Sequence, residues 1–115
     1  MKKPNNSFRL RHILDAIEMI GSYLEGFEIG SFNIDRKTQD AVVRQLEIIG
    51  EAAANVTTEL RDANPQVAWQ SAASARNRLI HGYFDVDPVV VWDIAENDLP
   101  VLKEQVEEIL KGLKM

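Results

Sequence analysis

The chain has 115 residues, 45% of them hydrophobic and 27% charged, which are ordinary values for a single globular domain spanning residues 1–115. Its net charge of −5 argues against a protein that coats nucleic acid nonspecifically, and the lack of cysteine excludes disulfides and thiolate metal sites. No apolar run approaches the ~20 residues of a membrane span and no signal-peptide core follows the first residues, so we expect a cytoplasmic protein without a membrane segment.

The first predicted helix covers residues 8–27, and Ser7 fits its N-cap. Apolar side chains recur in it at steps of three and four, namely Leu10, Ile13, Leu14, Ile17, Ile20, Leu24 and Phe27. Residues 28–34 break this period and predict a loop from which Phe32 or Ile34 reaches the core. The chain has no His-x-x-x-His and no Glu-x-x-His pattern, so we interpret His12 as a surface or interface histidine and expect no metal site.

A long helix is predicted for residues 35–61, ending before Asn64-Pro65 because the residue before a proline is steered out of the helical region. Its apolar stripe is wide, with Val42, Leu46, Ile49, Ala53, Val56 and Leu60 on the main face and Ala41, Ile48 and Ala52 beside them. Such width indicates burial on two sides, one of them against a second copy of the chain. The small residues from Gly50 onward suit a close approach of another helix, and Glu51 is either the partner of a buried arginine or solvated.

Trp69, Ala72, Ala73, Arg76 and Ile80 predict a helix up to about His81, with Gly82 as its stop. On that helix Asn77 and His81, four apart, would share a face, so the amide could orient the imidazole. Arg76 falls on the apolar stripe, where a guanidinium needs a partner such as phosphate oxygens.

The last third of the chain predicts two further helices. Asp87 and Pro88 form a cap and a first-turn proline for a short helix from Val89 to Asn97. Asp98-Leu99-Pro100 should restart or kink the chain into a final helix through about Leu113. The expected fold is therefore all-α, an antiparallel up-and-down bundle of four or five helices.

Residues 76–83 read Arg-Asn-x-x-x-His-x-Tyr, and this spacing resembles the signature of HEPN ribonucleases, specifically the HepT toxins of HepT/MntA toxin–antitoxin pairs. Residues 40–53, the approach from Asn64-Pro65 to Trp69, and residues 91–94 and 98–102 resemble that family in order and spacing. Together these matches cover nearly the whole chain, which makes the resemblance more specific than the short motif alone.

The resemblance implies a homodimeric endoribonuclease that cleaves RNA, in this family tRNA, without metal or other cofactor. Arg76 and His81 would be its catalytic residues, and Asn77 and Arg78 would support catalysis or bind substrate. Two histidines would meet in the dimer cleft, because one histidine is few for both acid and base work. Tyr83 would receive AMP from an MntA-like minimal nucleotidyltransferase antitoxin, which silences the toxin.

Other interpretations stay open at the level of sequence. Arg76 and His81 could merely close a helix end in a non-catalytic helical dimer that binds a nucleotidyltransferase partner. Tyr83 could be an ordinary half-buried tyrosine that packs under the helix end. Residues 85–108 hold eight acids and a single lysine, and this acidic face is either solvated or serves a basic partner.

Overall fold

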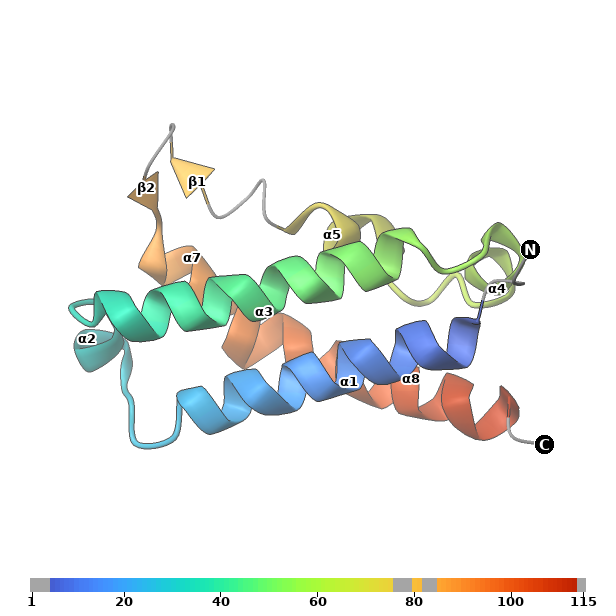
Figure 1. The fold of residues 1–115 in the computed structure, drawn as a ribbon, viewed down its shortest axis with the longest axis horizontal. Helices are drawn as coiled ribbons and strands as arrows, with labels where there is room; N and C mark the ends of the chain where they lie inside the picture. The colour runs from blue at the N-terminus through green and yellow to red at the C-terminus, as the bar shows by residue number, and fades with distance from the viewer. Residues whose placement is uncertain (1–4, 76–79, 82–84, 114–115) are drawn as a thin grey trace.

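The computed structural model describes residues 5–75, 80–81 and 85–113, and for Ile80, His81 and Asp85 it describes the backbone only. The described chain is almost entirely helical, which confirms the predicted all-α class (Figure 1). Its elements are α1 (Asn6–Tyr23), α2 (Ile29–Phe32), α3 (Arg36–Ala54), α4 (Thr58–Ala63), α5 (Trp69–Ala73), β1 (Ile80–His81), β2 (Asp85–Val86), α7 (Pro88–Asp93), η1 (Ile94–Asp98) and α8 (Leu99–Leu113). None of these helices is long and apolar enough to cross a membrane.

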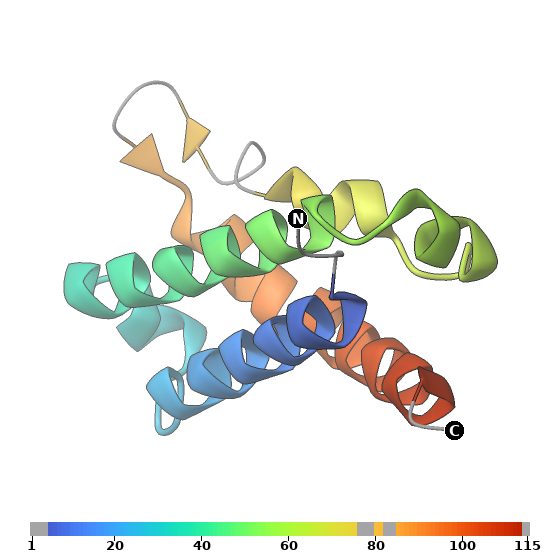
Figure 2. The same ribbon diagram turned by 45° about the vertical axis from the view of Figure 1, so that its right-hand side comes forward.

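The three longest helices form the body of the molecule. Figures 1 and 2 show α1 running antiparallel to both α3 and α8, with the start of α1 and the end of α8 at the same end of the molecule. The bundle's helix count and the homodimer remain predictions.

The first helix is shifted relative to its prediction. It begins at Asn6 because the side chain of Asn5, and not Ser7, caps it by accepting from the Phe8 amide at 3.0 Å. It ends at Tyr23, four residues early, and the turn that follows contains Gly26 at φ 78°, a conformation that side chains with a Cβ rarely adopt.

The segment predicted as a loop at residues 28–34 contains the short helix α2. Of the two candidate core residues, Phe32 is fully buried, whereas the side chain of Ile34 is 85% exposed. The buried Gln39 side chain donates from Nε2 to the Phe32 carbonyl at 2.8 Å, so this interior amide has a partner.

The long helix predicted for residues 35–61 is in fact two helices, α3 and α4. Asn55 ends α3, since its side chain donates to the Glu51 carbonyl at 2.8 Å, and Thr57 caps α4 by accepting from the Leu60 amide. The side chain of Asn6, at the start of α1, makes two hydrogen bonds with Thr57. Its Nδ2 donates to the Thr57 hydroxyl at 3.0 Å, and its Oδ1 accepts from the Thr57 backbone amide at 3.1 Å. As predicted, the second helix ends just before Asn64-Pro65.

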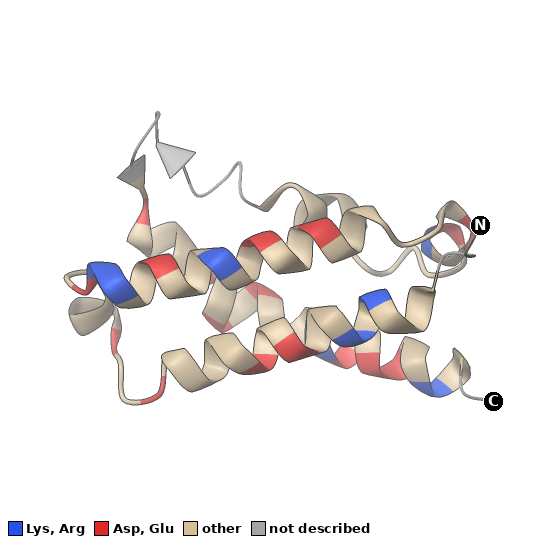
Figure 3. Cartoon of the chain, viewed as in Figure 1, with Lys and Arg blue, Asp and Glu red and all other residues tan. Residues whose placement is uncertain are grey.

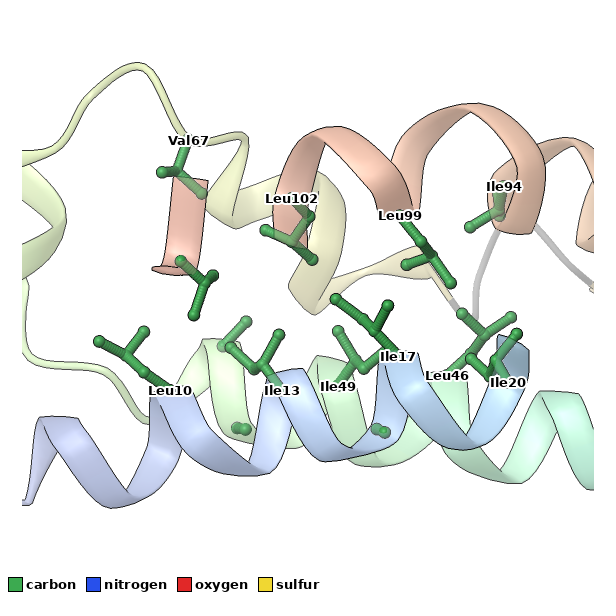
Figure 4. Close-up of a cluster of buried hydrophobic side chains, with 14 of the residues drawn as sticks. Leu10, Ile13, Ile17, Ile20, Leu46, Ile49, Val67, Ile94, Leu99 and Leu102 are labelled. Carbon is green, nitrogen blue, oxygen red and sulfur yellow. The ribbon is translucent and has the colours of Figure 1, made fainter. Parts of the chain in front are cut away.

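The core lies between α1, α3 and α8. Figure 4 shows the row Leu10, Ile13, Ile17 and Ile20 of α1 facing Leu46 and Ile49 of α3 and Leu99 and Leu102 of α8. Burying one such side chain stabilises the fold by about 1.5–3 kcal/mol, so this row accounts for much of the attraction between the helices.

A π-helix replaces the predicted break at Asp98-Leu99-Pro100. Leu99 donates its amide to the Ile94 carbonyl, five residues back, and the chain then continues as α8 without restarting. Pro100 has no amide hydrogen for an ordinary helical bond, which favours such an irregular turn next to it. The wider turn lets Ile94 and Leu99, five residues apart, both face the core.

Candidate functional site

Most of the predicted site residues lie outside the described residues. Arg76, Asn77, Arg78 and Tyr83 belong to this group, so their predicted roles stay predictions. His81 is described through its backbone and lies in β1, which pairs antiparallel with β2. The register places Ile80 opposite Val86 and His81 opposite Asp85.

The predicted helix up to His81 is therefore wrong at Ile80 and His81, whereas Ala75 is still helical. Ser74 follows α5 and donates its hydroxyl to the Gln70 carbonyl at 2.7 Å, a back-bond that bends helices. Farther on, the β-branched pair Ile80 and Val86 favours an extended ribbon. Because His81 is not on a helix, the argument that Asn77 shares its helical face no longer holds, and His81 does not sit at a helix C-terminus.

The chain on either side of residues 76–84 is fixed firmly to the core. On one side α5 packs against α3 so closely that a Cβ on Gly50 would lie 3.1 Å from the Ala73 carbonyl oxygen, which confirms the close approach predicted at Gly50. Ala75, directly before Arg76, is buried. On the other side Val86 packs against the core, and Asp87 caps α7 by accepting from the Val89 amide at 3.0 Å. Residues 76–84, called the motif segment below, are thus joined at both ends to chain that packs on the core.

A hollow of about 370 Å³ lies where α5 meets η1 and the start of α8. Its α5 side includes Ser71, Ala72 and, at the edge nearest the motif, Ala75. Its other wall carries polar groups on an otherwise apolar surface, including Asn97, whose amide donates to Asp93 at 2.6 Å. The described lining of this hollow thus includes Ala75, the residue before Arg76, and offers a partly apolar surface that suits a flat group.

Charge is distributed unevenly over the described surface. Figure 3 shows Lys and Arg on the first turns of α1, and charges of both signs along α3 and α8. The first turns of α1 carry Arg9 and Arg11, whereas α8 carries Glu104, Glu107 and Glu108 beside Lys103 and Lys111. Glu51 is exposed, which agrees with its solvated interpretation.

Sequence reasoning missed two features of this region. It did not pair His81 with Asp85, because only the ribbon brings these positions together. It also treated His12 alone, whereas the structure places its ring 4.2 Å from that of Phe8 and beside a second hollow between α1 and α3. The i, i+4 spacing of Phe8 and His12 on one helix was the available signal. Within the described ranges, no group of three His, Cys, Asp or Glu residues could hold a metal ion.

Comparison with known proteins places the chain in a family. The family described as "Ribonuclease HepT-like" matches residues 13–109, so the chain belongs to the HepT-like ribonuclease family. It is 39% identical over 111 residues to a Thermococcus cleftensis protein named "Probable ribonuclease HepT", covering 96% of this chain and all of the relative.

Other relatives carry similar names. The chain is 37% identical to "Putative RNase MJ0127" of Methanocaldococcus jannaschii, covering 98% of this chain and 93% of the relative. It is 38% identical to "Putative RNase TTE0752" of Caldanaerobacter subterraneus, covering 91% of this chain and 94% of the relative. No solved structure gives a significant match.

Proposed function

We propose that this protein is the toxin of a toxin–antitoxin pair, a metal-independent endoribonuclease that cleaves tRNA. The observation that carries the proposal is the family membership of a chain whose residues 76–83 contain Arg, His and Tyr in the spacing of the HepT signature. The fixed flanks support it, because a catalytic segment must be held in place from both ends to align reacting atoms.

RNA supplies its own nucleophile, which is why no metal-activated water is needed. His81 takes the proton of a ribose 2′-hydroxyl as its oxygen attacks the neighbouring phosphorus, and the 5′-oxygen leaves with a proton from a second acid. The products are a 2′,3′-cyclic phosphate and a 5′-hydroxyl. Arg76 stabilises the charge on the phosphoryl oxygens, while Asn77 and Arg78 orient the substrate.

The second acid comes from a second copy of the chain. A homodimer that shares one cleft supplies two histidines, one as base and one as acid. Exposed apolar side chains offer surface for such an interface, among them Val101, which is 55% exposed at the edge of the hollow beside α5. In this proposal an MntA-like nucleotidyltransferase inactivates the ribonuclease by transferring AMP to Tyr83.

The test is cleavage of tRNA in the presence of a chelator by wild type, His81→Ala and Arg76→Ala. Loss of a proton-transfer group or of a charge-stabilising donor typically lowers the rate by about 10²- to 10⁴-fold, so both variants should be nearly inactive. Circular dichroism should show unchanged helicity in both. Undiminished cleavage by either variant would overturn the assignment of that residue.

A further inference from the structure

A second hollow lies between α1 and α3. It measures about 390 Å³ and is lined by Arg9 and His12 of α1 and by Arg44, Glu47, Ile48, Glu51 and Ala52 of α3. Arg44, Ile48 and Glu51 follow each other at steps of four and three, so they share one face of α3. Gly50 and the α5 carbonyls it approaches lie on a different face. Figures 1 and 2 show the β1–β2 ribbon across α3 from α1, so the backbone of His81 and this hollow lie on opposite sides of α3.

The Arg9 side chain is the first notable group of this hollow. Its Nε is shielded from solvent and has no hydrogen-bond partner among the described residues. Arg9 and Arg44 both line the hollow, and a guanidinium is always charged. A planar guanidinium also matches phosphate oxygens well, so the hollow suits a ligand that brings phosphate oxygens to these two side chains.

An exposed aromatic pair lies beside this arginine. The Phe8 side chain is 52% exposed and its ring centroid is 4.2 Å from that of His12, with the planes tilted by 49°. An exposed aromatic surface next to cationic side chains is the combination by which proteins hold unpaired nucleotides, because bases stack on the rings while phosphates meet the cations.

The charges around the hollow limit what it can hold. Residues 5–14 carry Arg9 and Arg11 and no acid, and Arg44 of α3 lines the hollow together with Arg9. Glu47 and Glu51 also line the α3 wall, and Glu47 is already engaged in an interaction within the folded chain. Two carboxylates repel a phosphate that approaches them, so the site suits one or two phosphates on the α1 side and not the dense charge of a duplex.

We propose that this hollow, together with Phe8, binds an unpaired stretch of the RNA substrate outside the catalytic cleft. One base stacks on the ring pair of Phe8 and His12, and the adjoining phosphate lies between Arg9 and Arg44. The proposal rests on the proposed function, since it assumes that RNA is the substrate. It adds a contact that holds the substrate and takes no part in the chemical step.

The experiment measures binding of a fluorescein-labelled oligouridylate of about 12 nucleotides, within the span of known single-strand sites, by anisotropy in a chelator. All proteins carry His81→Ala, so that the probe is not cut. The test variants are Phe8→Ala, Arg9→Gln and His12→Ala, with His12→Phe to keep the ring without the imidazole. The control is Arg36→Gln, which removes the same charge from an exposed α3 arginine that pairs with Asp40 outside this hollow.

We expect Phe8→Ala to weaken binding by about fivefold or more, as loss of a stacked base does. Arg9→Gln should weaken binding and reduce the slope of log affinity against log salt by about one, the mark of a lost phosphate contact. His12→Ala should weaken binding while His12→Phe restores it, and Arg36→Gln should bind like its parent. In the chain that keeps His81, Phe8→Ala, Arg9→Gln and His12→Ala should raise KM for tRNA cleavage with little change in kcat, whereas Arg36→Gln and His12→Phe should keep the KM of wild type.

Equal binding by all variants would overturn the site and, if wild type still cuts tRNA, would leave the proposed function standing. Unchanged RNA affinity with a loss of dimer by light scattering would show that this face joins two copies, which also overturns the site. RNA binding that depends on Phe8 and Arg9 in a chain that cuts no RNA would support the site and contradict the nuclease. If neither binding nor cleavage occurs, both proposals fail.

Discussion

At the scale of single residues, the register of the β1–β2 ribbon gives His81 a neighbour that its sequence spacing hides. Asp85 is the backbone partner of His81 in the antiparallel register. A carboxylate in that position can orient an imidazole for proton transfer. Asp85 is thus a candidate positioning residue.

We predict that Asp85→Asn lowers kcat for tRNA cleavage by roughly 10- to 100-fold, because a misplaced catalytic group loses about that much rate. KM should change little, and Asp85→Glu should restore part of kcat. Steady-state kinetics would separate the two constants. A rise in KM with an unchanged kcat would instead make Asp85 a contributor to substrate binding.

Tyr83 carries the prediction about control of the enzyme. Tyr83→Phe should fold and cut tRNA nearly as well as wild type, but should escape inactivation when an MntA-like nucleotidyltransferase and ATP are added. A nucleotide attached two residues from His81 would block the cleft and repel RNA phosphates. Intact-mass spectrometry should show added AMP on wild type and none on the variant, and labelling that persists in the variant would place the control site elsewhere.

At the scale of elements, Gly50 sets how closely α5 approaches α3. A Cβ at this position would lie 3.1 Å from the Ala73 carbonyl oxygen and 3.3 Å from that of Ala72, both of them backbone atoms that cannot swing away. We predict that Gly50→Val destabilises the protein by about 1–3 kcal/mol, as overpacking does. Urea unfolding followed by circular dichroism would measure the change.

Gly21 on α1 offers the matched control, because nothing lies within 4 Å of a Cβ built there. Gly21→Ala should stabilise the protein by about 0.5–1 kcal/mol, the usual gain for replacing a helical glycine. If Gly50→Val were as harmless as this control, the contact between α3 and α5 would not be tight.

The elements also show what the sequence can predict and what it cannot. The three- and four-residue spacing located α1, α3 and α8 and most of their buried faces, since that pattern reflects the core directly. The break at Asn55 and the end of α5 were missed because they depend on side chains bonding back to local carbonyls, which no periodicity records. The ribbon was missed because a strand of two residues is too short for an alternating pattern.

The site could be predicted only through its resemblance to a family. The family match spans residues 76–83, where the roles of the side chains stay predictions, and the helical geometry assumed for that segment does not hold at His81. The arginine, histidine and aromatic residues between α1 and α3 are spread from residue 8 to residue 44, and packing alone brings them together.

At the scale of the whole molecule, the proposed mechanism requires a dimer, because it takes one histidine from each of two copies of the chain. Light scattering at micromolar concentration should give twice the chain mass of 13.0 kDa. Exposed apolar side chains away from the hollow between α1 and α3, such as Val101 of α8, offer surface for the second copy. A monomer that still cleaved tRNA would contradict the shared cleft.

The π-helix at Ile94–Asp98 contains one residue more than an α-helical turn, so the buried side chains before and after it follow two separate helical repeats, or phases. Val91 and Ile94 belong to the first phase, and Leu99, Leu102 and Val106 belong to the second, so the surplus residue acts as a phase shift between them. Deleting the exposed Glu96 would restore one phase and turn α7 by about 100° relative to α8. Because α7 directly follows β2, the strand that pairs with His81 would turn together with α7. The substitution Glu96→Ala keeps the number of residues in the π-helix and should leave this orientation unchanged. The length of this short turn therefore has to be kept even where its side chains are free to vary.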